Sequence, residues 1–214
     1  MFVPALPAPP AAPLTPSGIA SAPISLTAPA HTQVTVRSSQ LDVLDGGQAT
    51  VAGALLDEHR DGLGLRIVVL QAFRGHGWQT VTRVRTDTRG RYTLRYTPPQ
   101  MVSETVRVRF VGDSTALPAR RRAGTLTVYK LAGASWYGGG GGLACGGTLT
   151  SSTLGVANKT LPCGTLVTLR YNGRSVSVPV IDRGPYVEGR EFDLTEATKR
   201  ALGFGDVGQV WSTR

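Results

Sequence analysis

The sequence lacks any run of 18 apolar residues, so no segment is long enough to cross a membrane as an apolar helix. It also has only 2 cysteines, neither in a Cys-x-x-Cys pair, which is too few for a structural zinc site. All 3 histidines (His31, His59 and His76) lie in the first 76 residues, so the rest of the chain has no histidine to bind a metal or transfer a proton. We therefore expect no metal and no cofactor.

Lysine is scarce as well, so nearly all of the 23 basic residues are arginine. The net charge is +9, and most of it lies in residues 1–132, which carry 15 basic against 8 acidic residues, whereas residues 133–214 carry 8 against 6. This balance favours polyanions such as teichoic-type polymers, although a GC-rich genome gives the same arginine bias without a function. No basic patch alternates with aromatic residues and no nucleic-acid motif occurs, so we expect no nucleic-acid partner.

The first segment is rich in alanine, proline and serine and is nearly uncharged. It lacks the basic start and unbroken apolar stretch of a signal peptide. We predict a flexible leader over residues 1–32, left after processing or preceded by a start further upstream. Export is therefore inferred from the domains that follow.

Short β-branched or alternating segments separated by turns fill residues 33–131. The strands we expect are Gln33–Arg37, Ala49–Ala54, Leu65–Phe73, Trp78–Thr86, Tyr92–Tyr96, Thr105–Val111 and Thr125–Tyr129. Apolar and polar side chains alternate cleanly over 106–110, as in a strand with one buried face. Asp87 and Gly90 favour a hairpin turn, because Asp caps a turn and Gly takes positive φ. This spacing predicts a β-sandwich.

Two motifs in this part resemble bacterial immunoglobulin-like domains: T-D-x-x-G-x-Y over residues 86–92 and V-R-F-x-G-D over residues 108–113. The resemblance implies a spacer or wall-adhesion module, since nothing catalytic stands out. Arg120–Arg122 either contacts an anionic polymer or is a solvated charge run. We expect Leu131–Gly133 to link this domain to a second one, over residues 132–214.

The second domain contains ordered motifs: A-S-W-Y-G from Ala134, K-T-L-P-C-G-T from Lys159, and D-R-G-P-Y from Asp182. Asn172-Gly173 between two alternating segments predicts a tight hairpin. The set resembles the RlpA-like (rare lipoprotein A) family. That resemblance implies a secreted or envelope bacterial protein with a six-stranded double-psi β-barrel that acts on cell-wall polysaccharide. The whole chain is thus expected to be all-β, with one or two short helices.

Cleaving a glycosidic bond requires a carboxyl that protonates the leaving oxygen and a base that activates the nucleophile. Asp182 follows the pair Val180-Ile181 and Asp193 follows the pair Glu191-Phe192, both strand-like, so both are candidates. Asp182 has an alternative role as a turn-forming residue, but the family's catalytic Asp falls at this position. Asp193 is similar to the second acid of expansin-like barrels, or else caps a short helix over 196–202, a role that Thr195 also suits.

Five further residues are expected to bind substrate or support the acids. Tyr137 and Tyr186 lie near glycines and suit stacking on sugar rings, and Ser135 matches a polar groove residue of expansin-like barrels. Asn158 stands where the family commonly has a histidine; it can hydrogen-bond a sugar but cannot exchange a proton near neutral pH. Arg183 is expected to keep Asp182 ionised.

Cys145 and Cys163 are either a disulfide, worth roughly 3 kcal/mol and typical of an oxidising compartment, or two buried thiols. The function that the resemblance implies is a peptidoglycan lytic transglycosylase with Asp182 as general acid and base and Asp193 in support. The alternatives are an expansin-like module that binds or loosens the wall without catalysis, and an inverting hydrolase. We expect a monomer whose partner is peptidoglycan or a related glycan.

Overall fold

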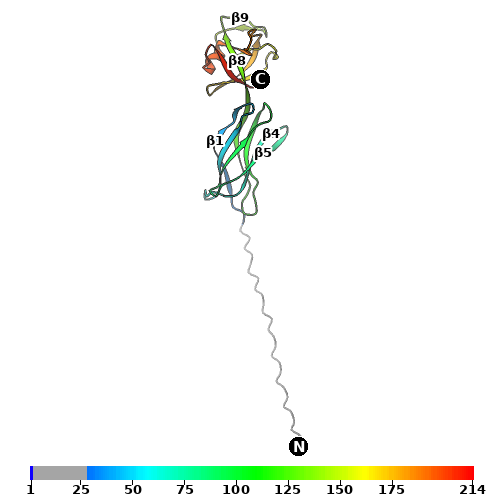
Figure 1. Cartoon of the computed structure of the whole chain (residues 1–214), viewed down its shortest axis with the longest axis vertical. Coiled ribbons are helices and arrows are strands. Elements are labelled where there is room, and N and C mark those ends of the chain that lie inside the picture. Colours follow the sequence, from blue (N-terminus) through cyan, green and yellow to red (C-terminus); the bar gives the residue numbers. More distant parts are fainter. Residues whose placement is uncertain (2–27) are drawn as a thin grey trace.

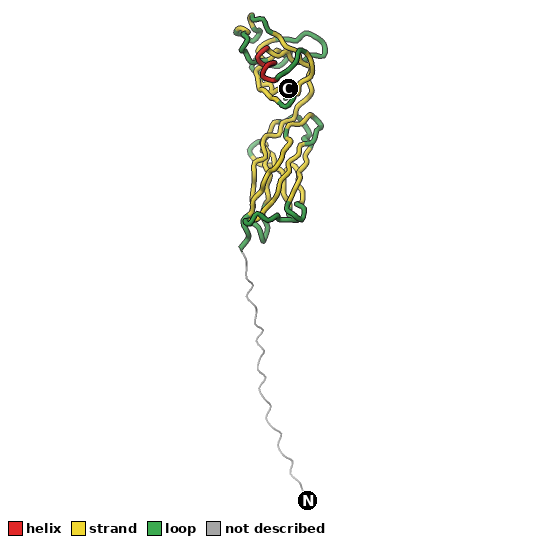
Figure 2. Tube along the Cα trace, turned by 90° about the vertical axis from the view of Figure 1, so that its left-hand side faces the viewer, coloured by secondary structure: helices red, strands yellow, loops and turns green. Residues whose placement is uncertain are grey.

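The computed structural model describes Met1 and residues 28–214, so the predicted leader over 1–32 lies almost wholly outside the described residues. The described chain contains 15 strands and a single helix, which confirms the expected all-β class. Two strand-rich bodies are stacked end to end, with the C-terminus in the second (Figures 1 and 2). No helix among the described residues is long and apolar enough to span a bilayer.

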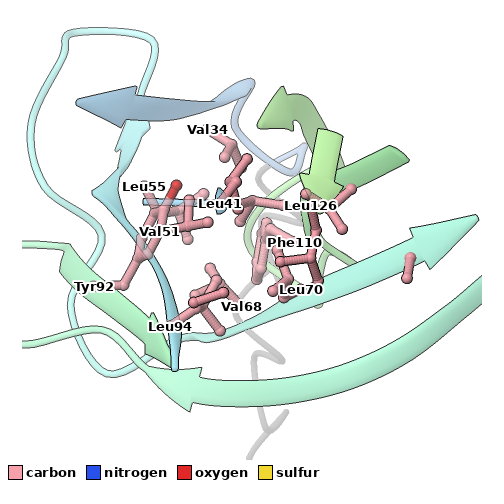
Figure 3. Packing of buried hydrophobic residues seen from close by; sticks show 14 of the residues in the cluster. Val34, Leu41, Val51, Leu55, Val68, Leu70, Tyr92, Leu94, Phe110 and Leu126 are labelled. Atoms are coloured by element: carbon pink, nitrogen blue, oxygen red, sulfur yellow. The ribbon is translucent and has the colours of Figure 1, made fainter. Parts of the chain in front are cut away.

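The first body consists of two sheets that enclose one core. The smaller sheet has the order β1 (Thr32–Gln40), β3 (Ala49–Asp57), β6 (Arg91–Tyr96). The larger one has the order β8 (Ala119–Tyr137), β7 (Ser103–Phe110), β4 (Ile67–Arg74), β5 (Gly77–Arg85), and β2 (Asp42–Leu44) pairs with β8. Side chains from both sheets, such as Val51 and Val68, meet between them (Figure 3). This is a β-sandwich; its immunoglobulin-like character stays a prediction.

Local sequence explains these strands. Along β7 the side chains at 106, 108 and 110 are buried in the sandwich core, while Arg107 and Arg109 point to the other face, as the period of two requires. The predicted turn before β6 is present: Asp87 Oδ1 accepts the backbone N–H groups of Arg89 and Arg91, both at 2.8 Å, and Gly90 has φ +75°. The turn carries the chain from β5 in the larger sheet to β6 in the smaller one, so it is a connection between sheets and not the predicted hairpin.

The second body is a barrel of six strands. Starting from β8, the ring continues through β14 (Phe192–Thr195), β11 (Val156–Ala157), β13 (Arg174–Asp182), β12 (Leu166–Tyr171) and β15 (Val207–Ser212), and β15 pairs with β8 to close it. The predicted hairpin joins β12 and β13, with φ +45° at Asn172 and +81° at Gly173. A separate two-stranded ribbon is formed by β9 (Gly141–Gly142) and β10 (Thr148–Leu149).

The connection between the two bodies differs from the prediction. Residues 131–133, expected to be a linker, lie inside β8, which runs through both bodies and pairs with β15 at these positions. Arg170 Nη1 of the barrel also lies 3.1 Å from Asp42 Oδ2 of the sandwich, and Tyr129 and Trp211 pack with ring centroids 5.9 Å apart. The connection is therefore a paired strand rather than a loop.

The helix, α1 (Glu196–Leu202), has the predicted bounds. Thr195 caps its start by accepting the Thr198 N–H at 3.3 Å, and Gly203 ends it in the left-handed region with φ +65°. The helix cap is therefore Thr195 and not Asp193. The Asp193 carboxyl does not cap the helix and is available for other contacts.

Candidate functional site

Four neighbouring barrel strands bring the two candidate acids into one row. In the order β13, β11, β14, β8, the cross-strand partners are Asp182, Ala157, Asp193 and Ser135. Strands lie about 4.8 Å apart, so two strand spacings separate the aspartate backbones, or roughly 10 Å. Residues 20 to 60 positions apart in sequence thus lie side by side, with only the small Ala157 between the two acids.

The row lies on the outer face of the barrel. The neighbours Ala134, Val156 and Leu194 belong to the barrel core, so the residues that follow or precede them in each strand face away from it. In β13 the register shifts so that Val156 pairs with Val180 but Ala157 pairs with Asp182. This bulge turns Asp182 toward the row, a common use of bulges beside functional sites.

Asp193 is a half-buried carboxyl with one side-chain partner. Ser135 Oγ donates to Asp193 Oδ1 at 2.7 Å. Burial raises the pKa of Asp193 above its usual value, and the charge of Asp182 adds to this, whereas the Ser135 hydrogen bond and the charge of Arg190 oppose it. Asp193 therefore holds its proton to a higher pH than a free aspartate does, which suits proton donation.

Asp182 is held by the backbone. Its Oδ1 accepts the N–H of Ala144 at 2.9 Å and the N–H of Arg183 at 2.8 Å. These two bonds join the end of β13 to the loop after β9 and fix the direction of the carboxylate. Asp182 can therefore both form the turn and act in catalysis, because both backbone hydrogen bonds go to Oδ1 and Oδ2 is not used by them.

A disulfide secures the same loop. Cys145 and Cys163 are bonded, with their Cα atoms 5.6 Å apart, which confirms the predicted bridge. The Cys145 N–H also donates to the Ile181 carbonyl at 3.2 Å, next to Asp182. The bridge thus ties the segment that supplies the Ala144 N–H to the loop that precedes β12.

Tyr137 supplies a third polar group. It follows Ser135 by two residues on β8 and so shares its face of the strand. Its hydroxyl is buried and makes no close, well-aligned hydrogen bond within residues 28–214, although the Asp182 side chain lies near enough to interact with it. Burial raises the pKa of Tyr137, and the charges of Asp182 and Asp193 raise it further, so the hydroxyl lies near both carboxyls. A buried hydroxyl without a close, well-aligned hydrogen bond is uncommon, and a ligand bound beside the acids would complete its bonding.

Asn158, expected to bind sugar, instead anchors the backbone. It is only 4% exposed. Its Oδ1 accepts the N–H groups of Thr160 and Leu161 at 3.0 and 2.8 Å, and its Nδ2 donates to the Glu191 carbonyl at 3.0 Å. The amide oxygen is therefore fully used in holding the loop before β12 against the segment that leads into β14.

Arg183 also differs from the expectation. Its guanidinium donates to the Asn158 and Leu161 carbonyls at 3.1 and 2.8 Å and to Cys163 Sγ at 3.1 Å. Within the described residues it makes no ion pair with Asp182, which it contacts only through its backbone N–H. The Arg183 side chain therefore binds the loop over residues 158–163 and not the Asp182 carboxylate.

The remaining aromatic candidates lie at the surface. Tyr186 is 79% exposed, so stacking on a sugar stays a prediction for it. Trp136 is also exposed; its Nε1 donates to Asp206 at 2.8 Å, and Lys199 Nζ lies 3.8 Å from the ring centroid. No set of three potential metal ligands occurs among residues 28–214.

One functional contact had no signal in the sequence. The N–H of Ala144 supports Asp182, but any residue except proline supplies such a donor, so side-chain identity does not reveal it. The importance of the Tyr137 hydroxyl was equally hidden, because its burial depends on strands that pair across the barrel.

Comparison with known proteins identifies what the barrel is similar to. Residues 130–211 match a family model described as "Lytic transglycolase". A "Probable endolytic peptidoglycan transglycosylase RlpA" from Aquifex aeolicus is 45% identical over 75 residues, which cover 33% of this chain and 33% of that protein. The "Endolytic peptidoglycan transglycosylase RlpA" of Pseudomonas aeruginosa is 40% identical over 86 residues, which cover 37% of this chain and 25% of the relative.

Among solved structures, the Streptomyces papain inhibitor aligns with a TM-score of 0.33 and 27% identity, covering 39% of this chain and 91% of its own. The chain spans no more than about a third of the length of the curated relatives just named. The family model covers the region of the six-stranded ring and its row of acids. The C-terminal domain of this chain is therefore an RlpA-like double-psi β-barrel.

Proposed function

We propose that the barrel is a peptidoglycan lytic transglycosylase that acts outside the cytoplasm. The observation that carries the proposal is the row in which Asp182 and Asp193 share one outer face with the Tyr137 hydroxyl near both. The names of the relatives support the activity, and the disulfide supports an oxidising compartment.

In this proposal Asp193 is the acid. It donates its proton to the glycosidic oxygen as the bond from that oxygen to the anomeric carbon breaks, and its raised pKa makes it better suited to this step than a free aspartate. The sequence alone favoured Asp182 for this step and gave Asp193 a supporting role. We reassign the roles because burial raises the pKa of Asp193, whereas two backbone N–H groups bind Asp182 Oδ1.

Asp182 is then the base. The 6-hydroxyl of the same sugar attacks the anomeric carbon, and its proton passes to Asp182 as the anhydro ring closes. One turnover leaves Asp193 ionised and Asp182 protonated, so a proton must return from Asp182 to Asp193. We assign the Tyr137 hydroxyl to bridging the two carboxyls for this return, because both of them raise its pKa.

Histidine takes no part in this scheme. The barrel sequence contains none, and Asn158 uses its amide to hold the backbone. The reaction therefore depends on the two carboxyls and the Tyr137 hydroxyl. Tyr186 is the exposed aromatic residue that we assign to sugar stacking.

The test is a digest of purified peptidoglycan, with and without stem peptides, read by mass spectrometry. Anhydro-muropeptides from the wild type, strongly reduced in Asp182→Asn and Asp193→Asn, would support the proposal. Glu188→Gln is the matched control, because Glu188 is an exposed acid of the same domain that makes no ion pair among the described residues.

Other products would contradict the proposal in distinct ways. Products with free reducing ends would mean that water is the nucleophile and the barrel is a hydrolase. No soluble product, together with sedimentation of the protein on the wall, would leave a non-catalytic wall-binding module.

A further inference from the structure

A second charged feature lies in the sandwich, far from the row of acids. Two adjoining hollows on the outer face of the larger sheet, about 700 and 430 Å³, share Arg107 and Arg120 in their walls. Their arginines come from β7 and β8: Arg107, Arg109, Arg120, Arg121 and Arg122. We name this set the arginine trough. No acidic residue lines either hollow.

Strand register concentrates these charges. Arg107 lies directly opposite Arg122, and Arg109 directly opposite Arg120, across the β7–β8 pair. Like charges opposite each other destabilise a sheet. None of the five arginines forms an ion pair within the described part of the chain. The fold therefore tolerates a repulsion that an anionic ligand would relieve.

Arg107 is held ready for such a ligand. Its Nε donates to Gln71 Oε1 at 2.9 Å, and its guanidinium carbon lies 3.9 Å from the centroid of the Trp78 ring. Its two Nη atoms have no hydrogen-bond partner among residues 28–214. Burial and the charges of Arg120 and Arg109 lower its pKa, which reflects the unrelieved positive field. A guanidinium fixed on one edge and free on the other suits bidentate binding of phosphate.

The shape of the trough selects a polymer over a small ligand. Along β7 the arginines repeat every second residue, or about 6.7 Å, so successive anionic groups of a linear chain meet successive arginines. Trp78 is covered by Arg107 on one face and packs edge-on against Phe73 at 5.4 Å. The trough therefore lacks the open aromatic platform on which single-stranded nucleic acid stacks.

We propose that the arginine trough binds a linear phosphodiester polymer of the cell wall and so holds the chain where the barrel acts. The polymer's assignment to the wall rests on the function proposed for the barrel and on the disulfide, which is typical of oxidising compartments outside the cytoplasm. The ligand's chemistry, repeated phosphodiesters, rests on the trough alone.

The test measures binding of the full chain to poly(glycerol phosphate) by titration at several salt concentrations. The variant replaces Arg107, Arg109, Arg120 and Arg122 by Gln. The control replaces four arginines in or beside the smaller sheet by Gln and loses the same charge: Arg37, Arg89, Arg91 and Arg95, all exposed. Because each exposed ionic contact contributes about a 2- to 3-fold factor, we expect about a 30-fold loss in the trough variant.

Salt dependence gives a second readout. Four lost phosphate contacts should make the slope of log affinity against log salt shallower by about 3 in the trough variant and leave the control slope near that of the wild type. If the quadruple variant does not fold, the double variant Arg120→Gln/Arg122→Gln, at two exposed sites, should lose about 5-fold in affinity and about 1.5 in slope.

Several outcomes would overturn the proposal. Equal losses in the trough and control variants would show a general charge effect without a site. Tighter binding of duplex DNA or polyglutamate, at matched charge concentration, would assign the trough to another ligand. Asp182→Asn should bind the polymer as the wild type does, so loss of polymer binding and loss of glycan cleavage are separable failures.

Discussion

Replacing Ser135 by alanine should raise the pKa of Asp193. Ser135 Oγ donates to Asp193 Oδ1 at 2.7 Å, and this bond lowers the pKa of Asp193 against the larger, opposite effect of burial. A hydroxyl donor stabilises the charged carboxylate, so its removal favours the protonated acid. The backbone pairing of Ser135 with Asp193 does not involve the hydroxyl and should remain.

The size of the change follows from the strength of this bond. Hydrogen bonds to charged groups contribute about 1.5–3 kcal/mol, and one pKa unit corresponds to about 1.4 kcal/mol. Because Asp193 is only half buried, water replaces part of the lost donor, so the lower end of that range applies. We expect a rise of about one pKa unit.

Carbon-13 NMR titration of the aspartate carboxyls measures this shift directly, without depending on activity. If Asp193 is the acid, the alkaline limb of the rate of anhydro-muropeptide release should move upward by the same amount, because activity requires the protonated form. Ser177→Ala, at an exposed serine of β13, is the control and should change neither. An unchanged or lowered pKa would refute the electrostatic reasoning, and a raised pKa with an unmoved limb would refute the acid role.

Other variants test the rest of the site. Asp193→Asn should stabilise the fold at pH 7 by about 0.5 kcal/mol after allowance for solvent screening, measured by thermal unfolding. The folded-state pKa of Asp193 is raised, so its ionised form destabilises the fold at pH values above that pKa. The stability gained by Asp193→Asn should therefore disappear as the pH falls through the pKa of Asp193. An equal gain at pH 3 would contradict this electrostatic origin. Tyr137→Phe should reduce transglycosylation about 100-fold yet leave stability unchanged or higher, since the buried hydroxyl makes no close, well-aligned hydrogen bond among the described residues. Lower stability with normal activity would reverse the assignment. Replacing Cys145 and Cys163 by Ser should lower the free energy of unfolding in urea by about 3 kcal/mol and also slow the reaction, because the bridge secures the loop that binds Asp182; a stability loss without a rate change would separate the two roles.

Features fixed by local sequence were the most predictable. The helix over 196–202 begins at a threonine cap and ends at a glycine, and both signals lie within one turn of it. The hairpin at Asn172-Gly173 likewise depends on two adjacent residues that adopt positive φ. Such elements carry their own start and stop signals, so the sequence alone predicts them.

The course of β8 depended on distant partners. Residues 131–133 look like a linker because they are small and lack alternation, yet they pair with β15, some 80 residues later. Gly133 is required there, since a Cβ atom would collide with the Gly189 carbonyl. No local pattern shows that a glycine admits a close approach by a segment about 55 residues away.

The site was predictable in its residue types and not in its contacts. Both acids follow apolar strand residues, which identified Asp182 and Asp193, but their position in one row depends on the short strand β11 pairing with both β13 and β14. The contact assigned to Arg183 was wrong for a related reason. Its long side chain follows the carbonyls of the loop at 158–161, whose shape depends on the Asn158 amide.

The two charged features are coupled by the strand they share. Arg120–Arg122 of the trough lie near the start of β8, and Ser135 and Tyr137 lie at its end. About 15 residues of strand separate them, and at a rise of about 3.3 Å per residue this is roughly 50 Å. Between them β8 is paired first with β7 and β2 and then with β15 and β14, so a paired strand sets this distance. If a wall polymer is bound in the trough, the barrel's acids can therefore reach only glycan strands about 50 Å from that polymer. A flexible linker would instead allow the acids to reach glycan strands over a range of distances.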